Sequence, residues 1–202
     1  MPDPLTHDAL NTFRRVLDPG DNSTGGGSAA AIAGAMAGAL VAMVARLSIR
    51  PDAVEPVSFY EEIAAEGTRL SRQLLAGSHE DAAAFDAVVG AYRLHKAGEA
   101  QVAARRAAIQ AAMIRATKAP LGNGQACLAI LELAARLEGR FNQQAASDLA
   151  CANHLAEAGL LGCLANVEIN LPGIKDAAKA EELRVAASGL RGYLESKGKE
   201  RP

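Results

Sequence analysis

Residues able to transfer protons gather in one short stretch, Ser78-His79-Glu80-Asp81. In a helix, Asp81 would share a face with the apolar Phe85 and Val88, turned towards the interior. A carboxylate on such a face must find a partner, ionise with an altered pKa, or take part in chemistry. The same stretch also fits a capping box, in which Ser78 caps a helix and Asp81 lies in its first turn. The residues alone leave both interpretations open.

A glycine-rich loop with the sequence TGGGS, from Thr24 to Ser28, is the second candidate site. Gly25, Gly26 and Gly27 would expose backbone N–H groups just before an apolar helix, which suits an anion or a closely approaching ligand. No lysine follows and no strand precedes the loop, so it is not a Walker A phosphate loop. The alternative is a flexible connector in which Ser28 caps the helix.

Cations and amides further along the chain could contact a ligand. Paired cations beside a cleft suit a carboxylate-bearing ligand, although a solvated helix face is the alternative; the candidates are Lys96, Arg105 and Arg106. A later polar series comprises Asn142, Ser147, Asp148, Asn166 and Asn170. The last two are one helical turn apart, and such amides either satisfy one another or bind a heterocycle rich in donors and acceptors.

The cysteines give little support for a metal site. Cys127, Cys151 and Cys163 form no CxxC pair and no even-numbered disulfide framework, which is typical of an intracellular chain. Cys151 and His154 would share a helical face, but two ligands do not complete a site. We expect no metal.

The composition predicts an all-α protein, because 45 of its 202 residues are alanine and only seven are aromatic. Alanine is the best helix former and a poor strand residue. The length suits a single domain over residues 1–202. A net charge of −2 shows no basic surplus, which argues against a nucleic-acid-binding protein.

Apolar residues at helical spacing, with breaks at proline and glycine, predict a bundle of about seven helices and no sheet. The expected helices cover residues 5–17, 29–49, 57–92, 100–117, 120–137, 147–171 and 176–197, the third being continuous or restarting at 77–78. The apolar run from Ala29 to Ala45 is short for a membrane span and is expected to be a core helix. Residues 1–21 contain no apolar run of signal-peptide length, so we expect a cytoplasmic protein without membrane contact.

Small residues follow one face of the second predicted helix, at Gly34, Gly38 and Ala42. They let another helix approach closely. This apolar strip has few large residues in the chain to cover it, so we expect a homodimer with helix-on-helix contacts.

The stretch GGGSAAAIAGAMAGALVAMVARL resembles the glycine-rich loop and following helix of the formimidoyltetrahydrofolate cyclodeaminase and methenyltetrahydrofolate cyclohydrolase family. Order and spacing are kept over roughly residues 20–171, and the motifs in register make the likeness specific. The further motifs are Asp81-Ala82-Ala83-Ala84-Phe85, Leu94-His95-Lys96, Arg105, Ala119-Pro120-Leu121, Asn142, Ser147-Asp148 and Asn166 to Leu171. Three residues depart from the family pattern: Thr24 replaces the proline usually found before the glycines, His95 replaces the proline of L-P-K, and Phe141 replaces the glycine before Asn142.

The resemblance implies an all-α homodimer that acts on one-carbon units carried by a tetrahydrofolate derivative, which is the substrate. It implies that Asp81 is the catalytic acid/base and that no metal or redox cofactor is needed. The residues that would contact the substrate are Gly25, Gly26, Gly27, Ser28, Lys96, Arg105, Asn142, Asp148, Asn166 and Asn170.

Two phrases, FDAVVGAY and AIQAAMIRATKAPL, look nearest to the stand-alone cyclohydrolase branch. The cyclodeaminase reaction, in which ammonia leaves, is the first alternative. A non-catalytic folate-binding or scaffolding helical dimer is an alternative of another class, and a phosphate-binding protein is a third.

Overall fold

The computed structural model describes residues 4–21 and 23–200, and their side chains over residues 10–21 and 23–196. The described chain is helical, with no strand, as expected. Its elements are α1 (Pro4–Leu17), α2 (Gly26–Leu47), α3 (Val57–Arg93), α4 (Glu99–Leu137), α5 (Ala146–Asn170) and α6 (Ala177–Glu200), with 3₁₀ turns at Gln143–Ala145 and Leu171–Gly173.

Two helix breaks allowed for in the sequence do not occur, and the absence of the second, at Pro120, leaves the described chain with six helices rather than about seven. α3 runs without interruption through Gly77 and Ser78. Pro120 lies inside α4, and the prediction that it starts a new helix is wrong. Proline lacks the N–H that would bond the carbonyl four residues earlier, that of Ala116. Asn170 Nδ2 donates to this carbonyl at 2.8 Å, so the helix continues with its freed acceptor satisfied.

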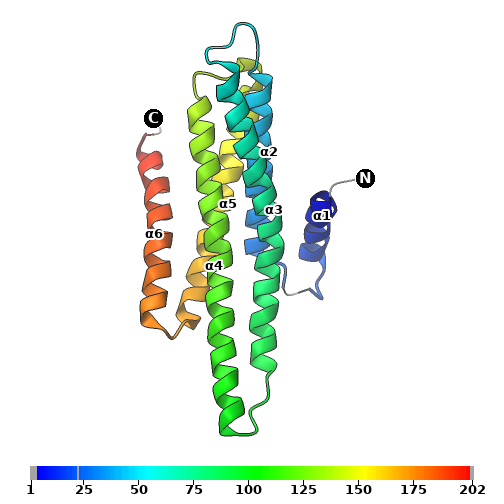
Figure 1. The fold of residues 1–202 in the computed structure, drawn as a ribbon, viewed down its shortest axis with the longest axis vertical. Helices are drawn as coiled ribbons and strands as arrows, with labels where there is room; N and C mark the ends of the chain where they lie inside the picture. The colour runs from blue at the N-terminus through cyan, green and yellow to red at the C-terminus, as the bar shows by residue number, and fades with distance from the viewer. Residues whose placement is uncertain (1–3, 22, 201–202) are drawn as a thin grey trace.

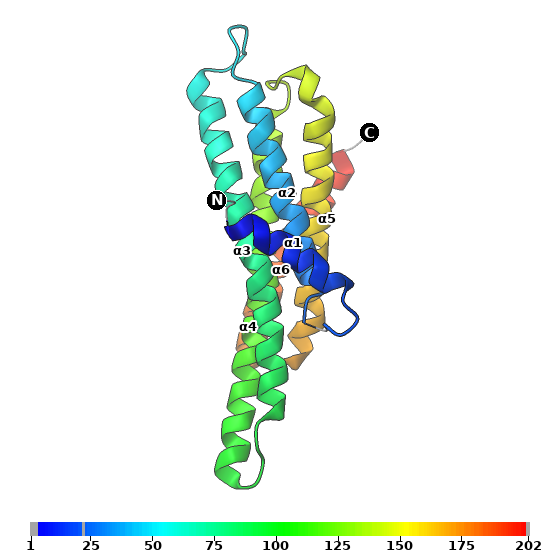
Figure 2. The ribbon, with the colours of Figure 1, turned by 90° about the vertical axis from the view of Figure 1, so that its right-hand side faces the viewer.

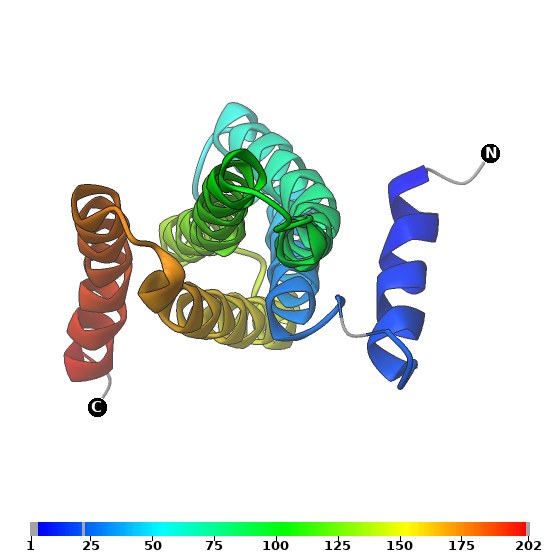
Figure 3. The ribbon, with the colours of Figure 1, turned by 90° about the horizontal axis from the view of Figure 1, so that it is seen from below.

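The helices α2, α3, α4 and α5 pack as an antiparallel four-helix bundle, with α1 and α6 on opposite sides of it (Figure 3). α3 and α4 have 37 and 39 residues, whereas α2 and α5 have 22 and 25. The longer pair therefore extends beyond the bundle at one end as a two-helix arm, formed by the end of α3 and the start of α4 (Figures 1 and 2).

Glycines bring the backbones of the bundle helices together. A Cβ at Gly38 would lie 3.0 Å from the carbonyl oxygen of Gly67 in α3, and one at Gly159 of α5 would lie 2.9 Å from that of Ala30 in α2. The small-residue strip of α2 does allow close approach, as predicted. Its partners lie in the same chain, however, and Gly34, the first residue of the strip, is buried. The inference that the strip needs a second copy to cover it is wrong.

α2 is long and apolar enough by composition to cross a bilayer. It contacts α3, α4 and α5, and 61% of its most apolar window is buried within the chain. The prediction that Ala29 to Ala45 forms a core helix is confirmed.

Candidate active site

The site lies at the step where the four-helix bundle gives way to the two-helix arm. α2 begins and α5 ends at this step, beside the middle of α3 and α4 (Figures 1 and 2). Asp81 is 24 residues into α3, and Ser78 Oγ donates within the helix to the carbonyl of Leu75 at 2.7 Å. No helix begins at Ser78, so the capping-box interpretation of this stretch is wrong.

The Asp81 carboxylate lies against the first turn of α2. Ser28 Oγ is 3.0 Å from Asp81 Oδ2 and 3.1 Å from the carbonyl oxygen of Ser78, both acceptors for its proton, and the Ser28 backbone N–H also donates to the carboxylate. The N-cap residue of α2 is Gly25, which has no side chain to cap the helix, so the alternative role of Ser28 as N-cap is wrong. Asp81 supplies the acceptor and the negative charge that a helix N-terminus favours.

The three glycines of the loop have different surroundings. A Cβ at Gly27 would lie 2.6 Å from both carboxylate oxygens of Asp81, so only glycine lets the carboxylate sit there. A Cβ at Gly26 would lie 3.4 Å from Asn166 Nδ2, whereas one at Gly25 would meet nothing within 4 Å. The loop therefore contacts Asp81 and Asn166 and exposes Gly25 and Gly26 to solvent.

Burial raises the pKa of Asp81 above its ordinary value of 3.8, and the hydrogen bonds from Ser28 oppose this only in part. No cation among the described residues contributes to the shift. A raised pKa makes the carboxylate a stronger base. It also moves the pH at which the carboxyl group becomes protonated closer to neutral.

The face of α3 that holds Asp81 is less enclosed than predicted. Phe85, one turn further on, is 43% exposed, and Val88 is half-buried. The expectation that this face turns to the interior is wrong for Phe85, because α2 begins at Gly26 and covers nothing further along the arm. Asp81 is therefore half-buried at an edge that a ligand can reach.

The two amides near the end of α5 point to different partners. Asn166 Nδ2 donates to the carbonyl of Gly162 at 2.9 Å and lies beside the glycine loop. Asn170 Nδ2 is bound to the carbonyl of Ala116 in α4. Asn166 therefore adjoins Asp81 across the loop. The NH₂ group of Asn170 instead donates to the carbonyl in α4 that Pro120 leaves without its helical donor.

The predicted cations lie on the arm. Lys96 is exposed in the loop between α3 and α4. Arg105 donates from Nε and Nη2 to the carbonyl of Tyr92, at 3.3 and 3.0 Å, and its guanidinium lies 5.6 Å from the centre of the Tyr92 ring. Tyr92 is 11 residues after Asp81, about 16 Å along the helix. Arg105 thus joins the two helices of the arm, and Arg106 is exposed.

Asn142 and Asp148 lie at the opposite end of the bundle. Asn142 Oδ1 accepts from Arg50 Nη1 at 3.0 Å, and Asn142 Nδ2 donates to the carbonyl of Leu47, the last residue of α2. Asp148 is in the first turn of α5. The 22 residues of α2 separate these side chains from Asp81 by about 30 Å. A single chain does not bring them to the Asp81 site.

The candidate metal ligands Cys151 and His154 are exposed on α5. Over the part of the chain that the structure describes, no group of three or more His, Cys, Asp or Glu side chains is arranged to hold a metal ion.

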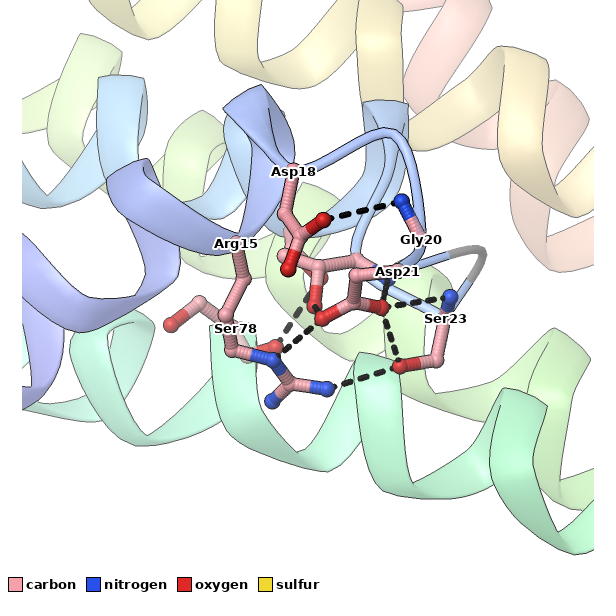
Figure 4. A network of polar contacts seen from close by, with 8 residues as sticks. Arg15, Asp18, Gly20, Asp21, Ser23 and Ser78 are labelled. Atoms are coloured by element: carbon pink, nitrogen blue, oxygen red, sulfur yellow. Dashed lines mark hydrogen bonds and ion pairs between the residues drawn. The ribbon is translucent and has the colours of Figure 1, made fainter.

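A polar network that the sequence analysis missed holds the segment before the glycines (Figure 4). Asp21 accepts from Arg15 Nε at 2.6 Å, from the N–H and Oγ of Ser23 at 2.8 Å each, and from the N–H of Thr24 at 3.2 Å. Arg15 is the main reason that the pKa of Asp21 lies well below its usual range. The family's proline would lack the N–H that Thr24 donates. An aspartate shortly before serine and threonine is typical of an Asx turn, the signal that could have revealed this Asp21 network.

Residues 9–189 match the family described as formiminotransferase-cyclodeaminase. Over 185 residues the chain is 37% identical to a methenyltetrahydrofolate cyclohydrolase from Methylorubrum extorquens, covering 91% of this chain and 89% of that relative. It is 30% identical to the formimidoyltransferase-cyclodeaminase of Sus scrofa over 92% of this chain, but spans only 35% of that relative's length.

A solved structure, that of formiminotetrahydrofolate cyclodeaminase from Thermotoga maritima, superposes with a TM-score of 0.80. The match covers 93% of this chain and 90% of the other, at 23% identity. At that identity the superposition establishes a shared fold.

Proposed function

The chain belongs to the formiminotransferase-cyclodeaminase family, and we propose that it is a folate-dependent enzyme that hydrolyses the methenyl bridge of methenyltetrahydrofolate. The relative matched over nearly its whole length is named for this reaction, whereas the chain spans about a third of the porcine relative. The observation that carries the proposal is the half-buried Asp81 carboxylate, whose pKa burial raises, at an accessible edge of the bundle.

Asp81 acts first as a general base. The oxygen of a water molecule attacks the cationic methenyl carbon while Asp81 takes one of the water protons, which gives a neutral tetrahedral carbon bonded to a hydroxyl group and two nitrogens. Ser28 holds the carboxylate in position through Oγ and the backbone N–H.

Asp81 then acts as the general acid. It returns its proton to one of the two nitrogens as the bond from that nitrogen to the tetrahedral carbon breaks. The hydroxyl group loses its proton as it becomes the carbonyl of the formyl product, so one proton is released overall. These steps require one carboxyl group that both accepts and donates, and we propose that no resident metal or redox cofactor takes part.

The glycine loop and Asn166 form the adjoining wall. Because Gly25 and Gly26 carry no side chains, a flat pteridine ring can approach their backbone closely. Asn166 lies beside Gly26, where its carboxamide can bond to the edge of the ring.

Formimidoyltetrahydrofolate cyclodeaminase activity is the second candidate, favoured by the match to the porcine bifunctional relative over 92% of this chain. In that reaction N10 of the folate attacks the formimino carbon and ammonia leaves. The same carboxyl group would serve, because the tetrahedral carbon again lies between nitrogens and a proton must be taken and returned.

Turnover measured on both substrates tests the proposal. We expect the purified protein to hydrolyse methenyltetrahydrofolate with a higher kcat/KM than it shows for release of ammonia from formiminotetrahydrofolate. The reverse order would establish the second candidate. If the protein binds folate but turns over neither substrate, the non-catalytic folate-binding dimer would be the remaining alternative.

We also propose that the protein is a cytoplasmic homodimer. The support is the outer face of α2 and α5, which neither α1 nor α6 covers (Figure 3). Large apolar side chains are exposed on these two helices, with Met36 at 55% and Leu161 at 48%. Light scattering at micromolar concentration should give about twice the 20.8 kDa chain mass, and a monomer would contradict the proposal.

A further inference from the structure

A cavity of about 590 Å³ opens next to the Asp81 site and has no part in the mechanism above. It lies between α3 on one side and α1 with the Asp21 network on the other. The α3 wall consists of Phe85, Asp86, Val89 and Arg93. The volume is within the range of small-molecule binding sites.

Asp81, Phe85, Val89 and Arg93 occupy every fourth position of α3. Such positions form a continuous ridge on a helix, with a rise of about 6 Å per step, so Asp81 and Arg93 are about 18 Å apart along the axis. Phe85 is 43% exposed and Val89 is half-buried. From Asp81 outward, the ridge therefore presents a carboxylate, an aromatic ring, an aliphatic side chain and a guanidinium.

Arg93 is the guanidinium of this cavity that remains available for an anion. It is exposed, and it makes no hydrogen bond or ion pair with any residue that the structure describes. Arg15, on the opposite wall, is engaged with Asp21 and Ser23. The lining also carries the carboxylates of Asp18 and Asp86, which repel an anionic group, so Arg93 is the part of the lining that attracts one.

We propose that this cavity binds the aminobenzoyl-glutamate part of the folate, with its ring against Phe85 and Val89 and a tail carboxylate on Arg93. The assignment rests on the proposed function, because it takes a folate as the substrate. A folate carries its one-carbon bridge, its benzoyl ring and its glutamate in the same order in which the ridge presents Asp81, Phe85 and Arg93. The tail is thereby assigned to Arg93 rather than to Lys96 and Arg105.

Kinetics of Arg93→Ala test the assignment with two substrates, methenyltetrahydrofolate and its analogue without the glutamate, methenyltetrahydropteroate. We expect KM for the glutamate-bearing substrate to rise about tenfold, the factor for one charge-assisted hydrogen bond at an exposed site, and kcat to stay unchanged. KM for the analogue should not change, and Arg93→Lys should recover part of the loss. The matched control is Arg72→Ala, an exposed arginine on the same helix without a described partner. Equal KM values for wild type and Arg93→Ala on both substrates would overturn the assignment.

Binding of p-aminobenzoylglutamate, followed by NMR, gives a readout that does not depend on turnover. Wild type and Arg72→Ala should bind this probe, and both Phe85→Ala and Arg93→Ala should weaken binding. If the probe binds through Arg93 but the protein turns over neither methenyltetrahydrofolate nor formiminotetrahydrofolate, the proposed function fails and the cavity assignment stands. Absence of probe binding to the wild type would overturn the assignment whatever the activity.

Discussion

Gly27 leaves the space that the Asp81 carboxylate occupies, and Gly27→Ala tests whether the position of the carboxylate matters. The added Cβ would lie 2.6 Å from both carboxylate oxygens, whereas ordinary contacts begin at 3.4 Å. The carboxylate must therefore move by about 0.8 Å, the difference between these distances. A displacement on the order of 1 Å from a catalytic geometry costs about 100-fold in rate, so we expect kcat to fall by about that factor.

The assay is steady-state hydrolysis of methenyltetrahydrofolate, together with thermal melting of each variant. Gly189→Ala is the control, because a Cβ at this exposed glycine of α6 meets nothing within 4 Å and the residue lies outside the site, so its kcat should stay close to that of the wild type. A folded Gly27→Ala protein with wild-type kcat would refute the reasoning, because the carboxylate would then tolerate displacement.

Two further predictions concern the structure around the site. Asn170→Ala should lower the free energy of unfolding by about 1–3 kcal/mol, because the carbonyl of Ala116 loses its donor. In a Pro120→Ala background the loss should be much smaller, because α4 regains the missing N–H. Urea denaturation of the wild type, the two single variants and the double variant measures both losses, and equal losses in the two backgrounds would contradict the prediction. Asp21 has a lowered pKa, so its stabilisation is complete above the ordinary value of 3.8 and is lost as the pH falls through the lower folded-state value. Melting temperatures measured from pH 2 to 7 should therefore fall less steeply towards acid in Asp21→Asn than in the wild type, and identical acid limbs would count against the role of the network.

The all-α fold could be predicted because alanine content and helical spacing act locally. The helix count could not, because the two breaks are repaired by distant residues. The acceptor that Pro120 leaves free is bonded by Asn170, 50 positions later. Gly77 stays helical with the Asn123 amide packed against it, where Nδ2 donates to the Gly77 carbonyl at 3.2 Å and a Cβ would lie 1.9 Å from Oδ1. Such tertiary contacts override local breaking signals.

The candidate residues of the site could be named from their types, but their grouping depends on tertiary packing. Asp81 and Ser28 are 53 positions apart, and no local pattern shows that they hydrogen bond. The separation of Asn142 from Asn166 could have been foreseen, because most of one helix lies between them and each residue adds about 1.5 Å. Arg93 was missed because the lack of a partner for its guanidinium follows from tertiary packing, in which Asp21, a carboxylate of the same cavity, is bonded to Arg15.

Turnover of methenyltetrahydrofolate by Asp81→Asn tests the central claim most directly. The asparagine Oδ1 can still accept from Ser28, so the variant should fold and melt close to the wild type. We expect kcat to fall by about 10²–10⁴, and the fall in wild-type rate at low pH, with an apparent pKa above 3.8, to disappear. A folded Asp81→Asn protein with wild-type kcat and an unchanged pH profile would show that Asp81 only stabilises the start of α2.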